Sequence, residues 1–415
     1  MSRAKYGFAP NPRSRKKEGW KMKRTAFVIL ACAILIAVMV PMAHAYYYVS
    51  PTWVPIYQGV DYYAGTSGGV NIYAVKVDLW DPNVSLYASH DNGAATKEVT
   101  TEFGYQFNAD HGCVVSANAS YCDPTSTGQA ATNVDIWGLG ICDGTVVSPG
   151  YYGGGAQYNC QMLFTAAKAA SIAITMDTPT GIHTAVTGNA YHLVGGYPLG
   201  ATDTYAARTS FGLSQDGRYL YMGCVNYANI YQLSCWMIDL GAWDAINMDG
   251  GGSTCLTRAD IGKVIPSGTE RRVGVHLGVR SAPLTYVVDN PAGTFSANWI
   301  LSTMSSQKYG ADYRYRSTQA VSDMFTWRPS LPVAGNYEVF AWWPAGTNRS
   351  LAAPYIINYN GGSANVKVNQ QTGGGQWNSL GTYPFAAGTA GHVKLSCWAT
   401  TGYVVVADAV CFVKR

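Results

Sequence analysis

The chain reads Ala245-Ile-Asn-Met-Asp249-Gly250-Gly251-Gly252-Ser253-Thr254 at the point that decides how its larger part folds. The apolar run over residues 243–248 predicts a short buried strand, which places Asp249 and the glycines in the loop at its carboxyl end. Glycines adopt positive φ freely and carry no side chain, so three in a row can aim their N–H groups at an anion or a sugar oxygen. A flexible Gly-Ser turn is the simpler alternative. The residues that accompany this loop favour a binding site.

The sequence before this loop predicts a domain of mixed helices and strands. Two helices are expected, over residues 96–108 and 229–240, and Gly241 ends the second. Apolar residues recur along the second helix at the 3-4-3 spacing of one face: Ile230, Leu233, Met237 and Leu240. Four runs have the composition of β-strands: residues 70–77, 113–117, 219–225 and 273–279. We therefore expect an α+β domain over residues 46–283.

After residue 286 the sequence changes to short strands and turns. Five runs of strand composition follow at regular spacing, separated by Gly, Pro, Asn and Ser: residues 337–341, 355–357, 366–368, 393–395 and 403–406. This pattern predicts an all-β sandwich, jelly-roll-like in form, over residues 284–415, with a linker over residues 281–287. Cys397 and Cys411 fall on neighbouring predicted strands and are the best candidates for a disulfide.

The N-terminus has the three parts of a secretory signal. Residues 1–24 carry nine Lys or Arg against one Glu, residues 25–42 are uncharged, and Ala43-His44-Ala45 follows. Cleavage is expected after Ala45; the alternative is a retained anchor, because about 18 apolar residues just span a bilayer. We therefore expect a secreted, extracellular or cell-surface protein that leaves the membrane once the signal is cleaved.

Removal of the signal reverses the charge of the protein. Of the 28 basic and 24 acidic residues, 19 and 23 remain, so the net charge changes from +4 to about −4. No basic tract is left, which argues against nucleic acid as a partner. Nine cysteines remain in a chain bound for an oxidising compartment. The 30 tyrosines and 46 glycines describe a turn-rich β protein whose aromatic surfaces suit sugar rings.

Residues 85–280 resemble the phosphodiester glycosidase family, which includes the lysosomal uncovering enzyme. The strongest similarity is the stretch Asn247-Met-Asp-Gly-Gly-Gly-Ser253, against Asn-Leu-Asp-Gly-Gly-Gly-Ser in the family. Three weaker matches keep the family's order: Ala117-Asn118 with Asp123-Pro124, Arg208-Thr209 with Gly212 and Asp216-Gly217-Arg218, and Glu270-Arg271-Arg272-Val273. The resemblance implies a catalytic domain that removes a sugar from a sugar phosphodiester.

One segment departs from that family. The family usually has Asn-Gly-Gly-Phe-Phe after the buried strand, whereas this chain has Asn118-Ala-Ser-Tyr-Cys122. The asparagine and an aromatic residue are retained, but both glycines are replaced. If the backbone must approach substrate here, activity or specificity has changed.

The arginines in these motifs fit the chemistry that the resemblance implies. Cleavage at the anomeric carbon builds oxocarbenium-like charge on the sugar and releases a phosphate monoester, whose second pKa is about 6. Such a leaving group needs charge stabilisation more than protonation, and arginines supply it as planar forks. Arg208 and Arg271 are the expected phosphate ligands, with Arg272 as the substitute if the register shifts by one. A surface ion pair is the alternative for each.

Asp249 is the expected catalytic carboxylate, as nucleophile, as general base for water or as metal ligand, with a cap of the glycine turn as the alternative. Glu270 is the candidate for a second carboxylate, and Asn118 is expected to hydrogen-bond a sugar hydroxyl or a phosphate. The loop supplies the expected phosphate-binding groups: the N–H groups of Gly250, Gly251 and Gly252, with Ser253 and Thr254 as positioning residues. Ser253 as a nucleophile lacks a histidine partner in the sequence.

No cofactor is required by these motifs. An oxygen-ligated Ca²⁺ or Mg²⁺ at Asp249 stays open. A zinc site is not expected, because the histidines show no ligand-like spacing: His111, His183, His192 and His276.

Residues 286–415 resemble the golvesin-type or xanthan-lyase-type domain of exported bacterial enzymes. The matching stretches are Val288-Asp-Asn290, Tyr313-Arg-Tyr315, residues 337–344, Asn369-Gln-Gln371, Gly375-Gln-Trp377 and residues 406–410. The resemblance implies a carbohydrate-associated β-sandwich. Four aromatic residues could stack on sugar rings: Trp342, Trp343, Trp377 and Tyr315. Strand alternation places one residue of the Trp342-Trp343 pair in the core.

These observations favour an exported hydrolase that cleaves sugar-1-phosphodiester linkages in a glycan or cell-surface polymer. The β-sandwich would hold it near that polymer. A catalytically silent glycan-binding or cell-surface protein is the main alternative, supported by the altered segment after Asn118. A third hypothesis, an exopolysaccharide enzyme that acts on an ordinary glycosidic bond, needs a strong general acid that the sequence does not reveal.

Overall fold

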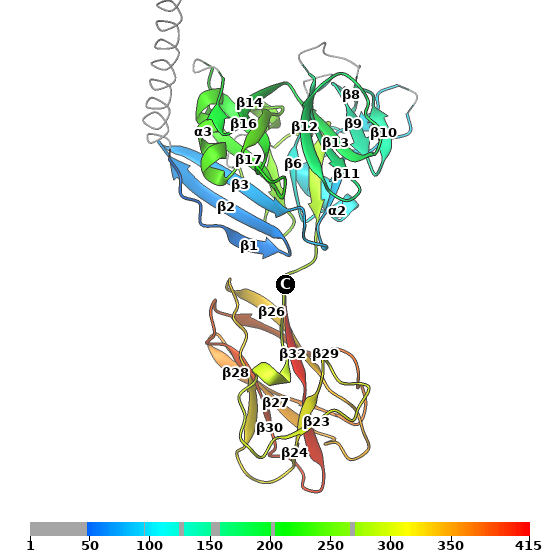
Figure 1. The fold of residues 1–415 in the computed structure, drawn as a ribbon, viewed down its shortest axis with the longest axis vertical. Coiled ribbons are helices and arrows are strands. Elements are labelled where there is room, and N and C mark those ends of the chain that lie inside the picture. The colour runs from blue at the N-terminus through cyan, green and yellow to red at the C-terminus, as the bar shows by residue number, and fades with distance from the viewer. Residues whose placement is uncertain (1–47, 95, 124–127, 151–157, 201–203, 266–269) are drawn as a thin grey trace, which may run out of the picture.

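Two lobes, joined by one connecting stretch, make up the computed structural model (Figure 1). It describes residues 48–94, 96–123, 128–150, 158–200, 204–265 and 270–415. The expected signal sequence, with cleavage after Ala45, lies outside the described residues. Within the described residues no helix is long and apolar enough to cross a membrane.

The first lobe is built on a large antiparallel sheet that carries a helix on one face. Its strand order is β1 (Val54–Tyr57), β2 (Val60–Ser67), β3 (Val70–Asp78), β17 (Tyr219–Ala228), β16 (Ala206–Leu213), β18 (Asp244–Asn247), β14 (Ala190–Val194) and β15 (Tyr197–Pro198). Helix α3 (Ile230–Leu240) confirms the second expected helix. Asn229 and Gln232 close its N-terminus with a capping box, and Gly241 ends it at φ 113°.

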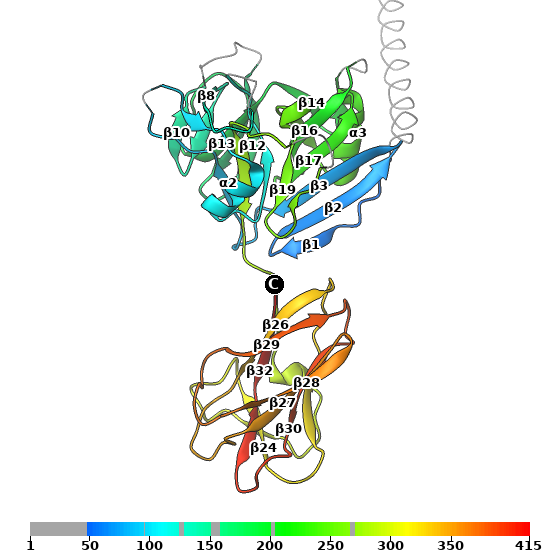
Figure 2. The ribbon, with the colours of Figure 1, turned by 180° about the vertical axis from the view of Figure 1, so that it is seen from behind.

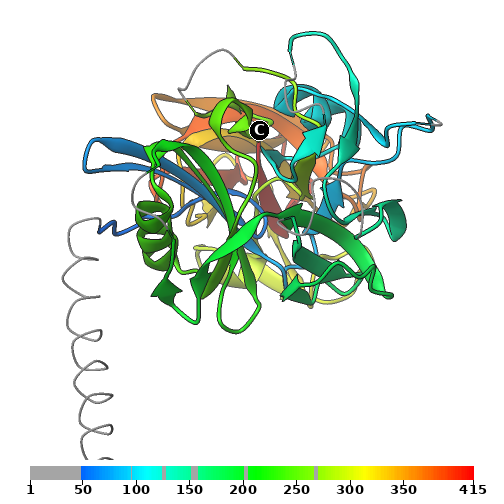
Figure 3. The same cartoon turned by 90° about the horizontal axis from the view of Figure 1, so that it is seen from above.

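Two five-stranded sheets lie beside this large sheet in the first lobe (Figure 3). One has the order β20 (Gly262–Lys263), β19 (Leu256–Arg258), β6 (Val115–Asn118), β21 (His276–Arg280) and β4 (Ser85–Ala88). The other has the order β10 (Thr145–Ser148), β9 (Gly140–Cys142), β13 (Ile182–Gly188), β11 (Cys160–Thr165) and β12 (Ala170–Ile174). The largest hydrophobic cluster of the lobe joins strands of all three sheets, as Ile246, Leu277 and Met162 show.

The first expected helix is shorter than predicted. Helix α2 runs only over Gly104–His111, because the β-branched residues Val99 and Thr100 form strand β5 (Val99–Thr100) instead. That strand pairs with β8 (Asn133–Ile136), which also pairs with β7 (Cys122–Asp123). The long-range sheet pairing therefore overrides the local helical pattern. The described part of the lobe is mainly β-sheet with two short α-helices, so the α+β expectation overstated the helical share.

The second lobe is an all-β structure of three small antiparallel sheets (Figure 2). The first contains β22 (Thr285–Val288), β32 (Ala409–Lys414), β26 (Gly335–Trp342) and β29 (Asn378–Phe385). The second contains β23 (Ile300–Ser302), β24 (Tyr313–Ser317) and β31 (Val404–Ala407). The third contains β25 (Met324–Trp327), β30 (His392–Ser396), β27 (Ala353–Tyr359) and β28 (Gly362–Val368). Their inner faces form one core around Trp327, Tyr355 and Phe412.

The expected Cys397–Cys411 disulfide is wrong. Cys397 follows β30 and Cys411 lies in β32, and these strands belong to different sheets of the lobe. All nine cysteines in the described part of the chain are free and buried. The prediction failed because it treated the two strands near these cysteines as neighbours, whereas the fold places them in different sheets.

The connecting stretch is held against the first lobe at the β1–β2 turn. Gln58 donates its backbone N–H to the carbonyl of Ala282 at 2.9 Å, and Tyr57 forms an isolated bridge with Pro283. Strand β21 of the first lobe ends at Arg280, and β22 of the second begins at Thr285.

Candidate functional site

The Asp249 loop lies where the ends of two sheets meet. Strand β18 ends at Asn247, after which the Met248 N–H donates to Thr209 O of β16 at 2.9 Å. The next residue, Asp249, donates its N–H to Ala119 O at 3.0 Å, just beyond the end of β6. The loop is therefore fixed on both sides by backbone hydrogen bonds from different sheets.

Each of the three glycines occupies a position that disfavours a residue with a side chain. A side chain at Gly250 would meet Ala207 O at 2.9 Å, and one at Gly252 would meet the guanidinium carbon of Arg271 at 3.2 Å. Gly251 has φ +58°, which disfavours other residues. Gly251, Gly252 and Ser253 form the 3-10 turn η1 (Gly251–Ser253), whose first N–H groups have no acceptor within the turn. The loop is therefore a shaped turn with N–H groups available at its start.

Asn118 ties this loop to its surroundings. Its amide nitrogen donates to Asp249 O at 2.6 Å, and its amide oxygen accepts from Thr209 Oγ1 at 2.6 Å and from Cys255 N at 3.0 Å. The side chain is 1 % exposed. These contacts use the amide oxygen and one N–H of the amide nitrogen, which favours a positioning role over the expected direct contact with substrate. We assign Asn118 to positioning the Asp249 backbone.

The Asp249 carboxylate is surrounded by donors. One oxygen accepts the Gly250 N–H at 2.9 Å. Burial raises the pKa of Asp249, while this hydrogen bond, the Ser253 hydroxyl and the charge of Arg271 lower it. The side chain is partly buried at the end of β18. The surroundings thus combine desolvation of a carboxylate with donors that hold its orientation.

Arg271 contacts Ser253, in the same loop as Asp249. Its Nη2 donates to Ser253 Oγ at 2.6 Å, and both the Ser253 hydroxyl and the charge of Arg271 lower the pKa of Asp249. The Nε of Arg271 is buried without a hydrogen-bond partner within the described structure. A guanidinium with an unused donor beside the start of turn η1 can bind an anion together with the backbone N–H groups.

Arg208 lies on the other side of the loop. Gly250 packs against its backbone and Cδ, and its guanidinium donates to Ala228 O at 3.3 Å and Thr204 O at 3.0 Å. Burial lowers the pKa of Arg208, and the nearby Tyr121 hydroxyl raises it. The guanidinium is bonded only to carbonyls in these contacts, so its charge is not neutralised by them.

Three aromatic residues complete the surroundings of Asp249. Tyr121 donates its hydroxyl to Met248 O at 3.0 Å and packs on Tyr158 at 4.9 Å between ring centroids. Tyr158 in turn packs on Trp137 at 4.7 Å. Burial and the charge of Asp249 raise the pKa of Tyr158. The sequence did not predict Tyr158 and Trp137 as site residues. It did indicate Tyr121, at an aromatic position of the family pattern, and Tyr121 packs on Tyr158.

Two of the expected site residues do not join this group. Burial raises the pKa of Glu270, while the charge of Lys263 and the backbone of Gly104, at the start of α2, lower it. Arg272 donates to Gln129 O at 3.0 Å and Thr101 O at 2.9 Å, and it lines a separate cavity. Successive residues of this segment thus face different parts of the lobe. The structure brings Asn118, Arg208, Asp249 and Arg271 together and leaves Glu270 and Arg272 outside.

The residues around Asp249 do not fit Ca²⁺ or Mg²⁺. These ions need several oxygen ligands, whereas the partners of this carboxylate are N–H, O–H and guanidinium donors. Among the described residues, no group of three His, Cys, Asp or Glu side chains is arranged to hold a metal ion. Ser253 accepts a hydrogen bond from Arg271, which agrees with a positioning role. Thr254 is 3 % exposed, and its hydroxyl has no hydrogen-bond partner in the described structure.

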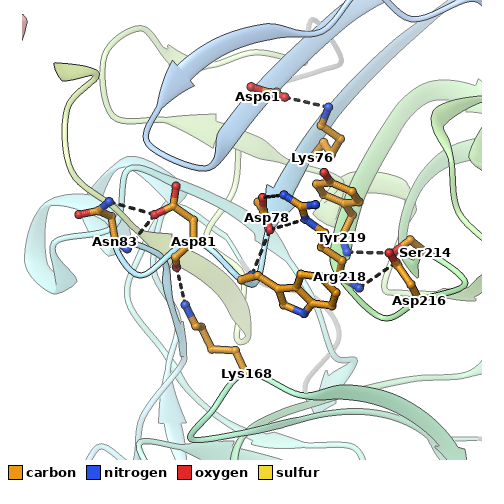
Figure 4. Close-up of polar contacts among 11 residues, drawn as sticks. Asp61, Lys76, Asp78, Asp81, Asn83, Lys168, Ser214, Asp216, Arg218 and Tyr219 are labelled. Atoms are coloured by element: carbon orange, nitrogen blue, oxygen red, sulfur yellow. Dashed lines mark hydrogen bonds and ion pairs between the residues drawn. The ribbon is translucent and has the colours of Figure 1, made fainter. Parts of the chain in front are cut away.

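The Asp216-Gly-Arg218 motif serves the fold and lies away from this loop. Figure 4 shows Arg218 paired with Asp78, at 3.1 and 2.6 Å, in the turn between β16 and β17. Asp216 accepts from Ser214 Oγ at 2.6 Å in the same turn. Arg208 lies near the start of β16, and this turn follows the end of the same strand. The family matches at Arg208 and at Asp216–Arg218 therefore lie at opposite ends of one hairpin.

His192 is a buried neutral side chain beneath Arg208. Its ring nitrogens contact Ser234 Oγ at 2.9 Å and Ser210 Oγ at 2.7 Å, and burial together with the Arg208 charge lowers its pKa to about 3. The unfolded chain binds a proton at this side chain near pH 6.5, so stability must fall as pH drops from about 6.5 toward 3.

We expect the melting temperature to fall between pH 7 and pH 4, and His192→Gln to reduce that fall. His90→Gln, an exposed histidine, is the control and should leave the pH dependence unchanged. Thermal unfolding at several pH values measures both. Equal acid sensitivity of folded His192→Gln and the parent protein would contradict the prediction.

In the second lobe the four predicted aromatic residues separate. Trp343 is 2 % exposed and donates its indole N–H to Thr372 O at 2.9 Å, so it belongs to the core. This agrees with the expectation from strand alternation that one residue of the Trp342-Trp343 pair is buried. Trp342 and Trp377 are partly exposed and pack at 5.4 Å with Tyr309 beside both. Tyr315 lies on β24 and lines a different cavity. Trp343 is therefore withdrawn from the candidate sugar contacts.

Comparison with known proteins agrees with both sequence resemblances. Residues 111–280 match the phosphodiester glycosidase family model, and residues 286–414 match the model of the Golvesin C-terminal domain. The first of these matched regions lies in the first lobe and the second lies in the second lobe. Xanthan lyase from Bacillus sp. (strain GL1) is 39% identical over 138 residues, which are 31% of this chain and 14% of that protein. The chain thus spans a small part of that relative.

Solved structures show weaker similarity. A Paenibacillus xanthan lyase has a TM-score of 0.35 at 18% identity, covering 88% of this chain and 25% of that one. The catalytic domain of zebrafish N-acetylglucosamine-1-phosphodiester alpha-N-acetylglucosaminidase, auto-inhibited by its pro-peptide, has a TM-score of 0.42 at 17% identity, covering 56% and 86%. A family 35 carbohydrate binding module from Clostridium thermocellum has a TM-score of 0.26 at 18% identity, covering 32% and 99%. At these TM-scores the structural similarity carries no weight for function.

Proposed function

We propose that this protein is an exported hydrolase that cleaves sugar-1-phosphodiester linkages in a glycan or cell-surface polymer. Residues 46–283 would form the catalytic domain and residues 284–415 a β-sandwich that binds the polymer. The observation that carries the proposal is the pair Arg271 and Ser253, joined by a 2.6 Å hydrogen bond at a glycine turn, where both residues act on the pKa of the Asp249 carboxylate.

In this proposal the phosphate binds between Arg271, Arg208 and the first N–H groups of turn η1. Both arginines stabilise the negative charge that grows on the departing phosphate monoester, so the leaving group needs little protonation. The sugar packs against Tyr121 and Tyr158. Asp249 faces the anomeric carbon as nucleophile or as base for water, and Ser253 lowers the pKa of its carboxylate.

The altered segment after Asn118 does not obstruct this arrangement. Ala119 is fully buried, and its carbonyl accepts the Asp249 N–H. Ser120 is 3 % exposed, and its hydroxyl accepts the Thr187 N–H at 2.8 Å, on the side of β13. Both side chains are therefore accommodated by packing. This observation favours the hydrolase over the catalytically silent alternative.

One assay tests the proposal. Methyl phosphodiesters of several sugar 1-phosphates are incubated with the protein, alongside aryl glycosides of the same sugars, and released sugar is measured. We expect the best phosphodiester to be cleaved at least about a hundredfold faster than its glycoside, because only it engages the arginines. Turnover of no phosphodiester would favour the silent glycan-binding alternative, and equal turnover of the glycosides would favour an ordinary glycosidase.

A further inference from the structure

A cavity of about 260 Å³ opens on the second lobe, and neither Trp342 nor Trp377 lines it. Strands β24 and β31 pair to form its base, and the loop over residues 346–350 borders it. Figures 1 and 2 place β24 at the end of the second lobe that is turned away from the first. A ligand here would be bound well apart from the Asp249 loop.

Arg349 gives this cavity its charge. Its backbone is fixed, because its N–H donates to Gly346 O at 3.0 Å and its carbonyl accepts from Gln371 Nε2 at 2.9 Å. Its side chain donates from Nη1 to the neutral Asn348 Oδ1 at 2.6 Å, while its Nε is buried without a hydrogen-bond partner in the described structure. The guanidinium is thus held in place with a donor unused.

Two of the other four arginines of the lobe, Arg316 and Arg415, have acidic partners. Arg316 pairs with Asp323 at 2.9 Å, and Arg415 pairs with Glu338 at 2.6 Å. Arg349 has no carboxylate within 4 Å among the residues that the structure describes. A fixed, partly buried guanidinium without a counter-charge, at the wall of a cavity, is suited to an anion from outside the chain.

The remaining walls suit the ring of a sugar. Tyr313 is 4 % exposed and lies at the base, and Tyr315 is partly exposed on the same strand. Met304, at the border of the cavity, is 89 % exposed and so is accessible to a ligand. Aromatic and thioether surfaces pack well on the apolar face of a pyranose.

We propose that this cavity is a subsite for an acidic glycan, in which Arg349 binds a carboxylate or phosphate carried by a sugar that packs on Tyr315 and Met304. This inference rests on the proposed glycan-binding role of the second lobe and names its ligand class. It assigns recognition of the polymer's charge to a place distinct from the site of cleavage.

Titration calorimetry with the full protein tests the inference. The ligands are an oligoglucuronate and the cello-oligosaccharide of equal length, which differ in the carboxylate alone, with glucose 1-phosphate as a competitor. We expect the oligoglucuronate to bind at least about tenfold more tightly than the neutral oligosaccharide, and Arg349→Gln to remove that difference. Arg328→Gln, an exposed arginine of the same lobe, is the control and should bind like the parent protein. Competition by glucose 1-phosphate would show that a phosphate serves as well as a carboxylate.

Equal binding of both oligosaccharides, no binding of either, or unchanged binding by folded Arg349→Gln would overturn the inference. Thermal unfolding of each variant establishes that it is folded. Turnover of small phosphodiesters by the parent protein decides the proposed hydrolase separately, because those substrates carry no polymer for the second lobe to bind. Tyr315→Ala provides a second check and should weaken binding of the oligoglucuronate.

Discussion

Asp249→Asn is expected to reduce kcat on a sugar-1-phosphodiester by about 10²- to 10⁴-fold while the protein stays folded. An amide can accept the Gly250 N–H as the carboxylate does, and burial already disfavours the charged form. The variant therefore removes the reactive oxygen without disturbing the loop. Because the pKa of Asp249 is raised, activity of the parent protein that depends on the carboxylate should fall as pH drops through that raised value.

The matched control for this variant is Asp244→Asn. Asp244 begins the same strand and accepts the Gly195 N–H at 2.9 Å, a bond that asparagine can keep. Kinetics of both variants, with thermal unfolding alongside, measure the effect. Full activity of Asp249→Asn would remove this residue from the chemistry.

The anomeric form of the released sugar separates the two roles of Asp249. A carboxylate that attacks the sugar forms a covalent intermediate and gives retention, whereas a carboxylate that activates water gives inversion. Proton NMR of the product in the first minutes of reaction distinguishes them. The Asp249 carboxylate accepts the Gly250 N–H in either case, so the geometry of its support is common to both.

The glycine loop could be predicted from sequence because its reasons are local. Three consecutive glycines after an apolar strand already indicate close backbone approach and positive φ, and the structure assigns these needs to Gly250, Gly251 and Gly252. Helix α3 was predictable for the same reason, since its cap, apolar face and terminating glycine all lie within one segment. Information of this kind does not depend on the rest of the fold.

Features that depend on distant partners were predicted less well. Asn118 has a chemically plausible substrate role until Thr209 and Cys255 are seen to occupy its amide oxygen. The adjacent residues Arg271 and Arg272 have the same chemistry, and only the path of their segment shows which one faces Asp249. Helix α2 and the cysteine pair failed for the same reason, since strand pairing over long sequence distances decides both.

Replacing each of these two arginines by alanine turns that distinction into a test. Arg271→Ala is expected to lower kcat/KM on the phosphodiester by about 10²- to 10³-fold, because it removes a charge-assisted donor to the growing negative charge. Arg272→Ala should have little effect on turnover, since Arg272 contacts the carbonyls of Gln129 and Thr101 instead. Equal losses in the two variants would contradict the assignment.

The pH profile of Arg271→Ala distinguishes an effect on the pKa of Asp249 from a purely structural effect of the substitution. The positive charge of Arg271 lowers the pKa of Asp249, so its removal lets burial raise that pKa further. If the carboxylate is the active form, the acid limb of the rate profile must then move to higher pH, while the profile of Arg272→Ala keeps its position. Added guanidine should restore part of the activity of Arg271→Ala, because Ser253 and the turn that receive the guanidinium remain in place. A shift without loss of rate would assign Arg271 to tuning Asp249 alone, whereas loss without a shift would assign it to the phosphate.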